Sequence, residues 1–291
     1  MTVAYGLLVS LAAGLVTDAP WLNFALLFVS VMMMVELNNS NALIRIYSRM
    51  VSCSFLVMTI MSLFLFQTID VAVVQITFIA FLLFQLRSYQ DSNATGLTFY
   101  AFCALGIGSI VFPQILLFLP ALWIVMATYI QNFSPRTFLS SIIGVIAPYW
   151  FVTAWLIYTG KYAWLGTHFI SILQFGTPFY LANVELHEWL TFAFVFLCAF
   201  IGSIHFFAYS YQDRIRIRLI YEMLIVLDGL TMFFAIIQPQ HFDSLLGMAI
   251  VLTAPIIGHW LALTSSRLSN IVSMLLAAAA FALTIYNMIG I

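Results

Sequence analysis

The sequence predicts an all-α, polytopic helical membrane protein of about eleven transmembrane helices, and three observations support this. Charged side chains make up 7% of the 291 residues, whereas soluble domains carry about 25%. Hydrophobic residues make up 64%, and the mean hydropathy is +1.11. Apolar runs follow one another from end to end, and each is long enough to cross a bilayer as a helix. We therefore interpret 1–291 as a single integral-membrane domain.

Short polar segments containing glycine or proline divide the runs. The first run ends at Asp18-Ala19-Pro20 and lacks the basic start of a signal peptide, so we interpret it as a membrane helix. Residues 96–131 are too long for one helix and contain Pro113 near the middle, which favours a tight hairpin of two helices. The expected spans are 3–17, 21–37, 50–67, 70–86, 95–112, 114–131, 137–159, 188–210, 219–237, 244–264 and 270–289.

The arginines test this division, because cytoplasmic loops collect Lys and Arg. Every arginine follows an even-numbered span, and the only lysine, Lys161, falls on the other side. This pattern predicts a cytoplasmic N-terminus and an external C-terminus. We expect the arginines to fix topology and to contact lipid headgroups, most strongly at the triplet in "YQDRIRIRLIYE". They are Arg45, Arg49, Arg87, Arg136, Arg214, Arg216, Arg218 and Arg267.

The longest external segment, 160–188, is aromatic and apolar but is interrupted by glycines and Pro178. This composition predicts an interfacial or re-entrant segment within the membrane domain. It could cap a cavity, or it could be a connector that rests on lipid. Within it, "VELHEW" places two carboxylates around a histidine, which indicates a helix start or a divalent-metal site.

Four histidine or carboxylate residues lie at least three residues inside the ends of the expected spans, where such groups are expensive and often functional. His205, Glu222, Asp228 and His259 come from three consecutive helices and could converge in the inner half of the bilayer. They could form interhelical hydrogen bonds that fix packing, or a proton relay. His205 and His259 could also bind a transition metal, the one cofactor suggested here, although the sequence has no paired metal motif.

Asp18 is a separate catalytic candidate, beside Glu222 and Asp228. Polytopic sugar transferases that act on lipid-linked substrates carry a catalytic acid in their first external loop, and Asp18 is the only carboxylate in that loop here. The loop is only a few residues long, and no soluble substrate domain follows it. The sequence therefore leaves this enzyme class open without favouring it.

The order of features resembles a family of bacterial polytopic inner-membrane proteins that has no assigned activity. The matching pieces are "LNNSNALIRIYSRM", the long segment from "FLLFQLRSYQDSNATG" to "LPALWIVM", "PRTFLSSIIGVIAPYW" and "APIIGHWLALTSSRLSNI". The resemblance implies a location in the bacterial inner membrane. Some members of such families are labelled carotenoid-cleaving oxygenases, whose histidines stand in P-H-G and H-F-G motifs; "SIHFF" matches one in part, and the others are missing.

These observations favour an inner-membrane protein without a catalytic motif, which binds a lipidic or hydrophobic ligand or supports a membrane assembly or cell-envelope process. The alternatives are an enzyme on lipid-linked substrates, either a sugar transferase or a metal-dependent carotenoid-type oxygenase, and a proton-coupled transporter. Membrane lipids and other membrane proteins are the expected partners. The absence of a basic stripe argues against nucleic acid.

Overall fold

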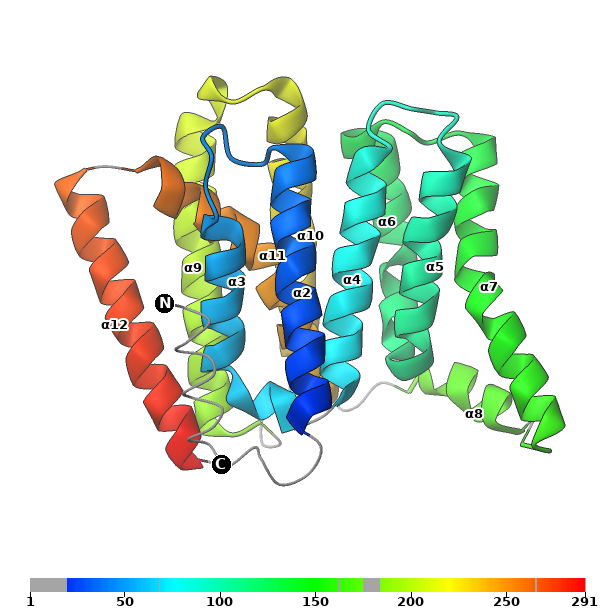
Figure 1. Cartoon of the computed structure of the whole chain (residues 1–291). Coiled ribbons are helices and arrows are strands. Elements are labelled where there is room, and N and C mark those ends of the chain that lie inside the picture. The colour runs from blue at the N-terminus through cyan, green and yellow to red at the C-terminus, as the bar shows by residue number, and fades with distance from the viewer. Residues whose placement is uncertain (1–19, 68, 162, 175–183, 265, 291) are drawn as a thin grey trace.

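The computed structural model describes residues 20–67, 69–161, 163–174, 184–264 and 266–290. These residues contain eleven α-helices and no β-strand, and the longer helices run side by side (Figure 1). The helices are α2 (Pro20–Asn41), α3 (Met50–Met61), α4 (Ile69–Arg87), α5 (Thr95–Val111), α6 (Leu119–Val125), α7 (Pro135–Tyr158), α8 (Ala163–Ser171), α9 (Leu186–Tyr209), α10 (Ile215–Ile237), α11 (Phe242–Leu263) and α12 (Arg267–Gly290).

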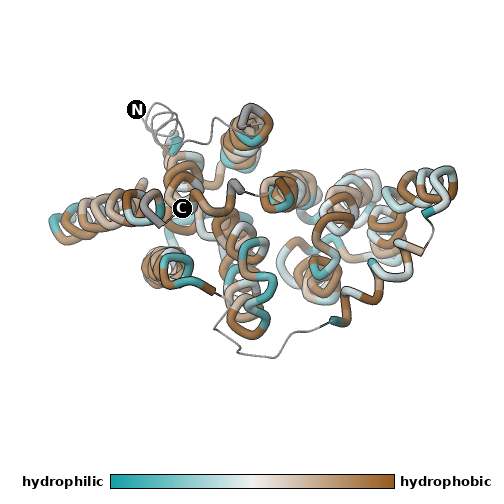
Figure 2. The backbone as a smooth tube through the Cα atoms, turned by 90° about the horizontal axis from the view of Figure 1, so that it is seen from below, coloured by the Kyte–Doolittle hydropathy of each residue, from teal (hydrophilic) through white to brown (hydrophobic). Residues whose placement is uncertain are grey.

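Eight helical segments of the described residues are long and apolar enough to cross a membrane, and α3 and α5 are shorter apolar helices. One of the eight, Pro113–Ile130, joins α6 to the 3₁₀ and π turns on either side of it. The all-α class is confirmed, and the helices fit a multi-pass membrane protein. The apolar colour dominates most of them when they are seen nearly end-on (Figure 2). The total of eleven spans and the orientation of the termini stay predictions, since the expected span 3–17 lies outside the described residues.

Helix α11 is the inner helix of the bundle. It packs against α3, α4, α9 and α10, and 89% of the residues in its apolar 18-residue stretch are buried. Two glycines allow this close packing. A Cβ atom on Gly202 of α9 would lie 2.8 Å from the carbonyl oxygen of Ile256, and one on Gly258 would lie 3.0 Å from Cα of Val51 in α3. Side chains of α11 therefore meet protein, and its polar groups have partners within reach.

Helices α5 to α8 form the opposite side of the molecule (Figure 1). Helix α5 packs on α7. Only 28% of the residues in the apolar 18-residue stretch of α7 are buried. The short α8 lies across the lower end of these helices in Figure 1. Buried His168 attaches α8 to this pair, because its Nε2 lies 3.1 Å from the carbonyl oxygen of Ser109 and 3.2 Å from the hydroxyl of Tyr149. Whether the segment 160–188 lies at the membrane interface stays a prediction.

The helix starts follow from local sequence. Ser134 and Thr137 form a capping box at α7, with Pro135 in the first turn. At α9, the Glu188 carboxylate accepts a hydrogen bond from the backbone N–H of Glu185 at 2.9 Å. The "VELHEW" segment is thus a helix start, with Glu185 at the N-cap and Glu188 in the first turn, where the helix dipole favours negative charge.

The connections and helix ends that carry the arginines lie at the upper end of the bundle in Figure 1, which we call the arginine end. These are the α2–α3 connection, the end of α4, and the starts of α7, α10 and α12. Lys161 follows α7 at the opposite end. The separation of the arginines from the lysine, expected from the sequence, is present in the structure, whereas the side of the membrane that each end faces stays a prediction.

Candidate functional site at the arginine end

Two adjoining cavities open at the arginine end. The first, which we call the histidine cavity, has a volume of about 260 Å³ and is lined by Arg45, His205, Tyr209, Gln212, Asp213, His259, Leu263, Thr264 and Ser266. The second, the arginine cavity, has a volume of about 340 Å³ and is lined by Ser40, Asn41, Ala42, Ile44, Arg45, Gln212, Asp213, Arg214, Arg216 and Ile217. The two cavities share Arg45, Gln212 and Asp213.

A buried carboxylate–imidazole pair forms the wall of the histidine cavity. Oδ2 of Asp213 lies 3.1 Å from Nε2 of His259, and the two side chains are 3% and 1% exposed. The ring of His205 lies 5.9 Å from that of His259, between centroids. Nδ1 of each histidine is buried without a hydrogen-bond partner in the described part of the chain. Each histidine therefore keeps one buried ring nitrogen whose hydrogen-bonding capacity no described residue uses.

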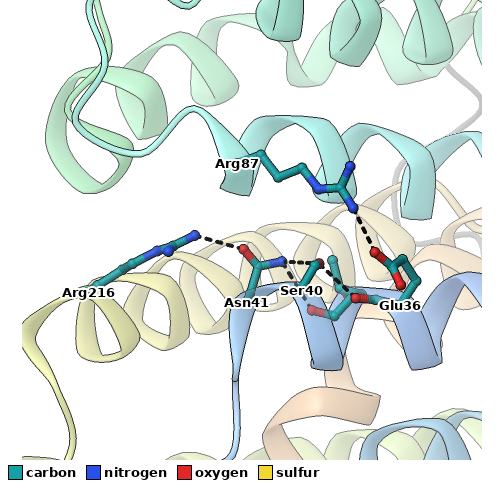
Figure 3. A network of polar contacts seen from close by, with 6 residues as sticks. Glu36, Ser40, Asn41, Arg87 and Arg216 are labelled. Atoms are coloured by element: carbon teal, nitrogen blue, oxygen red, sulfur yellow. Dashed lines mark hydrogen bonds and ion pairs between the residues drawn. The ribbon is translucent and has the colours of Figure 1, made fainter.

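The arginines of the two cavities are held by neutral acceptors. Arg45 donates to Oε1 of Gln212 at 2.6 Å. Arg216 donates to Oδ1 of Asn41 at 2.9 Å, as Figure 3 shows, and to the carbonyl oxygen of Leu86 at 3.0 Å. No carboxylate is paired with either guanidinium among the described residues.

The same polar network contains an ordinary ion pair for comparison. Arg87 contacts Glu36 at 2.7 Å, and both side chains are about half exposed (Figure 3). By contrast, among the described residues Asp213 is the one acid that lines either cavity, and its carboxylate faces His259. Against the three guanidinium groups of Arg45, Arg214 and Arg216, this single carboxylate leaves the cavities with a net positive charge.

An apolar groove continues along the same helices, away from the arginine end. Phe194, Cys198, His205 and Tyr209 of α9 are spaced four, seven and four residues apart, so they share one helix face. The first two line the groove and the last two line the histidine cavity. The groove has a volume of about 220 Å³ and is lined by Met50, Cys53, Ser54, Val57, Met58, Phe194, Cys198, Ile257, Leu261, Ser273, Leu276, Ala277 and Ala280.

The structure brings together two of the four intramembrane candidates, His205 and His259. Asp228 lies deeper, 2% exposed, where Thr253 donates to its Oδ2 at 2.9 Å. Glu222 is half-buried on α10, and no described contact links it to the other three. Asp18 lies outside the described residues, so the sugar-transferase interpretation stays a prediction.

The metal interpretation also stays a prediction. Within the described ranges, no group of three or more His, Cys, Asp or Glu side chains is placed to hold a metal ion. His205 and His259 alone would supply two ligands, and Nε2 of His259 already faces Asp213.

Sequence reasoning missed Asp213, Tyr209 and Gln212 as site residues. Asp213 directly precedes the arginine triplet. This position was the one feature of the sequence that could have drawn attention to its carboxylate. Its partner, His259, is 46 residues further along the chain. Only the packing of the α9–α10 turn against the end of α11 brings the pair together.

A scan of the sequence against protein-family models finds no match, and searches of the curated proteins and of the solved structures find none. The described helices fit a multi-pass membrane protein with polar, basic cavities at one end and an apolar groove below them.

Proposed function

We propose that the protein binds an anionic amphipathic lipid at the seam between α9, α11 and α12. The headgroup occupies the two cavities at the arginine end, and the hydrocarbon chain lies in the groove. The single observation that carries this proposal is that the two cavities, which share Arg45 and have a net positive charge, open at the end of the bundle from which the apolar groove runs along α9 and α11.

The headgroup is a phosphate. Arginine presents a planar fork of donors that matches phosphate oxygens, and such charge-assisted hydrogen bonds are stronger than neutral ones. Arg45 lines both cavities, and Arg214 and Arg216 line the second. Nδ1 of His205, which has no hydrogen-bond partner among the described residues, adds a further polar atom beside the histidine cavity.

The hydrocarbon chain adds affinity by burial, at about 0.8 kcal/mol for each buried methylene group. The groove lies between α3, α9, α11 and α12, so a chain that enters it leaves the bilayer for a surface of Phe, Met, Leu and Ile side chains. With the arginine end cytoplasmic, as the distribution of arginines favours, the lipid belongs to the inner leaflet. The family resemblance supports a location in the bacterial inner membrane.

Native mass spectrometry of the purified protein in mild detergent tests the proposal. Phosphatidylglycerol should be retained at concentrations where phosphatidylcholine of the same chain length is not. Arg45→Gln should weaken phosphatidylglycerol binding by roughly tenfold, as expected for one charge-assisted contact. Arg136→Gln, an exposed arginine at the same end that lines neither cavity, is the matched control and should leave binding unchanged.

A second pair of variants separates the groove from the cavities. Ala277→Trp places a large side chain in the groove and should reduce retention of long-chain lipid, while leaving a short-chain analogue bound. Ala278→Trp, also exposed on α12 but outside the groove, should have no effect. Equal retention of the two lipids, with no response to Arg45→Gln or Ala277→Trp, would overturn the proposal.

A further inference from the structure

A line of buried polar side chains leads from the histidine cavity into the bundle between α10 and α11. Tyr221, Leu224, Asp228 and Thr231 lie on one face of α10, and all are buried. The polar members of the line are each at most 3% exposed: Asp213 by its side chain, His259, Tyr221, Thr253 and Asp228. We propose that this line is a proton path that begins at the histidine cavity and ends at Asp228, which is the proton-binding site of the bundle.

The entrance is the pair of Asp213 and His259. The Asp213 carboxylate accepts from Nε2 of His259, so this nitrogen carries the hydrogen and Nδ1 holds a free lone pair. The ionisable neighbours of the pair are Arg45, His205 and Tyr209, which line the same cavity. Water in the histidine cavity can therefore deliver a proton to an imidazole that the carboxylate orients.

Tyr221 is the next member inward. Its ring centroid lies 4.7 Å from that of His259, and its hydroxyl donates to the carbonyl oxygen of Pro255 at 3.5 Å. Pro255 is one turn deeper along α11 than His259, so the phenol extends from the imidazole towards the centre of the bundle. A fully buried hydroxyl can both accept and donate a proton, which is what a path requires.

Asp228 ends the line. It is seven residues beyond Tyr221 on the same face of α10, roughly 10 Å along the helix axis. Thr253 donates to Oδ2, and Oδ1 is buried without a partner among the described residues. No Lys, Arg or His side chain of the described chain contacts this carboxyl group. Because an isolated carboxylate is costly to bury, Asp228 binds a proton, and Oδ1 is the free atom that takes it.

The transfer changes only O–H and N–H bonds. A hydronium ion in the cavity gives its proton to His259 and becomes water, and the imidazolium then gives a proton to the phenol oxygen of Tyr221 as the phenol's own O–H proton moves inward. Imidazole and phenol are thus restored, and the carboxylate of Asp228 becomes a carboxylic acid. No electrons are transferred and no co-reactant is needed. The path does not depend on the lipid proposal, since it requires only water in the cavity.

Infrared difference spectroscopy of the full-length protein in nanodiscs tests the path. Wild type should show a carboxylic-acid C=O band that is absent from Asp228→Asn. After transfer into D₂O, the deuterium shift of this band should be slower in Tyr221→Phe and in His259→Gln by roughly tenfold or more. Tyr149→Phe removes a buried phenol on the other side of the molecule and should leave the rate unchanged.

Two outcomes overturn the proposal: a band that persists in Asp228→Asn, or exchange at the wild-type rate in both path variants. If Asp228→Asn does not fold, Thr253→Val gives the assignment instead. It removes the hydrogen bond to Oδ2 and should shift the C=O frequency of the same band. A band that is unmoved in Thr253→Val would then contradict the assignment to Asp228.

Discussion

Helices α7 and α11 are 24 and 22 residues long, and each contains an internal proline, Pro148 or Pro255. Their surroundings differ: 28% of the residues in the apolar 18-residue stretch of α7 are buried, against 89% of those in the corresponding stretch of α11. Trp150, Phe151 and Trp155 of α7 point outward. A buried polar group needs partners, which lipid does not supply. Buried polar side chains on α11 therefore indicate where a binding site can form. An internal proline alone does not indicate a site, because α7 also contains one.

The two regions also use histidine differently. His168, in the α5–α8 region, is hydrogen-bonded and packed against Trp164 at 4.4 Å between ring centroids, so it attaches a helix. His205 and His259, in the α11 region, line a cavity and retain unpartnered nitrogens. His168 therefore has a structural role, whereas His205 and His259 belong to the site of the proposed function.

The largest expected effect comes from the contact between α9 and α11. In Gly202→Ala the new Cβ would lie 2.8 Å from the Ile256 carbonyl oxygen, so the backbones must move apart. We expect the free energy of unfolding to fall by about 1–3 kcal/mol, as for other overpacked cores. Thermal unfolding in detergent measures this.

Gly229→Ala on α10 is the matched control, because no atom lies within 4 Å of its Cβ position. It should be neutral or stabilising by up to about 1 kcal/mol, from helix propensity. Equal loss in both variants would show that α11 is not the tightly packed centre.

Breaking the buried pair of Asp213 and His259 should give the next loss of stability. Asp213→Ala leaves Nε2 of His259 buried without its acceptor, which should cost about 1–3 kcal/mol of unfolding free energy. Glu36→Ala breaks the half-exposed pair with Arg87 and should cost less than about 1 kcal/mol. Chemical denaturation of both variants compares them, and a larger loss in Glu36→Ala would refute the ranking.

A smaller, pH-dependent effect belongs to α8. Burial lowers the pKa of His168, so the folded protein favours the neutral ring. The stabilisation is present above the unfolded pKa of about 6.5 and is lost as the pH falls below it. The protection factors of the α8 amides, which correct the exchange rates for the base-catalysed intrinsic rate, should therefore be lower at about pH 5.5 than at about pH 7.5. His168→Gln should remove this difference; a pH-dependent protection factor that survives the substitution would assign the effect to another group.

Single cysteine substitutions, which should have the smallest effect on stability, test which side of the membrane each end of the bundle faces. In a chain without Cys53, Cys103 and Cys198, single cysteines at Tyr47 and at Tyr158, both highly exposed, should react with a membrane-impermeant reagent from opposite sides. Tyr47 lies at the arginine end and should be protected in intact cells. Labelling of both positions from the same side would contradict the orientation.

Much of the fold followed from the sequence, because a bilayer permits few alternatives to apolar helices. The parity of the arginines predicted which connections share an end, and Figure 1 shows that they do. The interruption at Pro113 also matches a helix break, with a 3₁₀ turn at Pro113–Phe118.

The site followed only in part. His205 and His259 stood out as ionisable groups in apolar runs, and they do meet. Asp213 was missed despite its place beside the arginine triplet, because its partner His259 lies 46 residues further along the chain and only the fold buries the two together. The groove was also beyond sequence reasoning, since its wall is made by four helices whose neighbours are set by packing rather than by chain order.

The most direct test of the central claim is a cryo-EM map of the protein in nanodiscs that contain phosphatidylglycerol. The account predicts an elongated density in the groove between α9, α11 and α12, ending in a phosphate within hydrogen-bond distance of Arg45. A map with an empty groove and unoccupied cavities, or with lipid ordered only around α5 to α8, would contradict it.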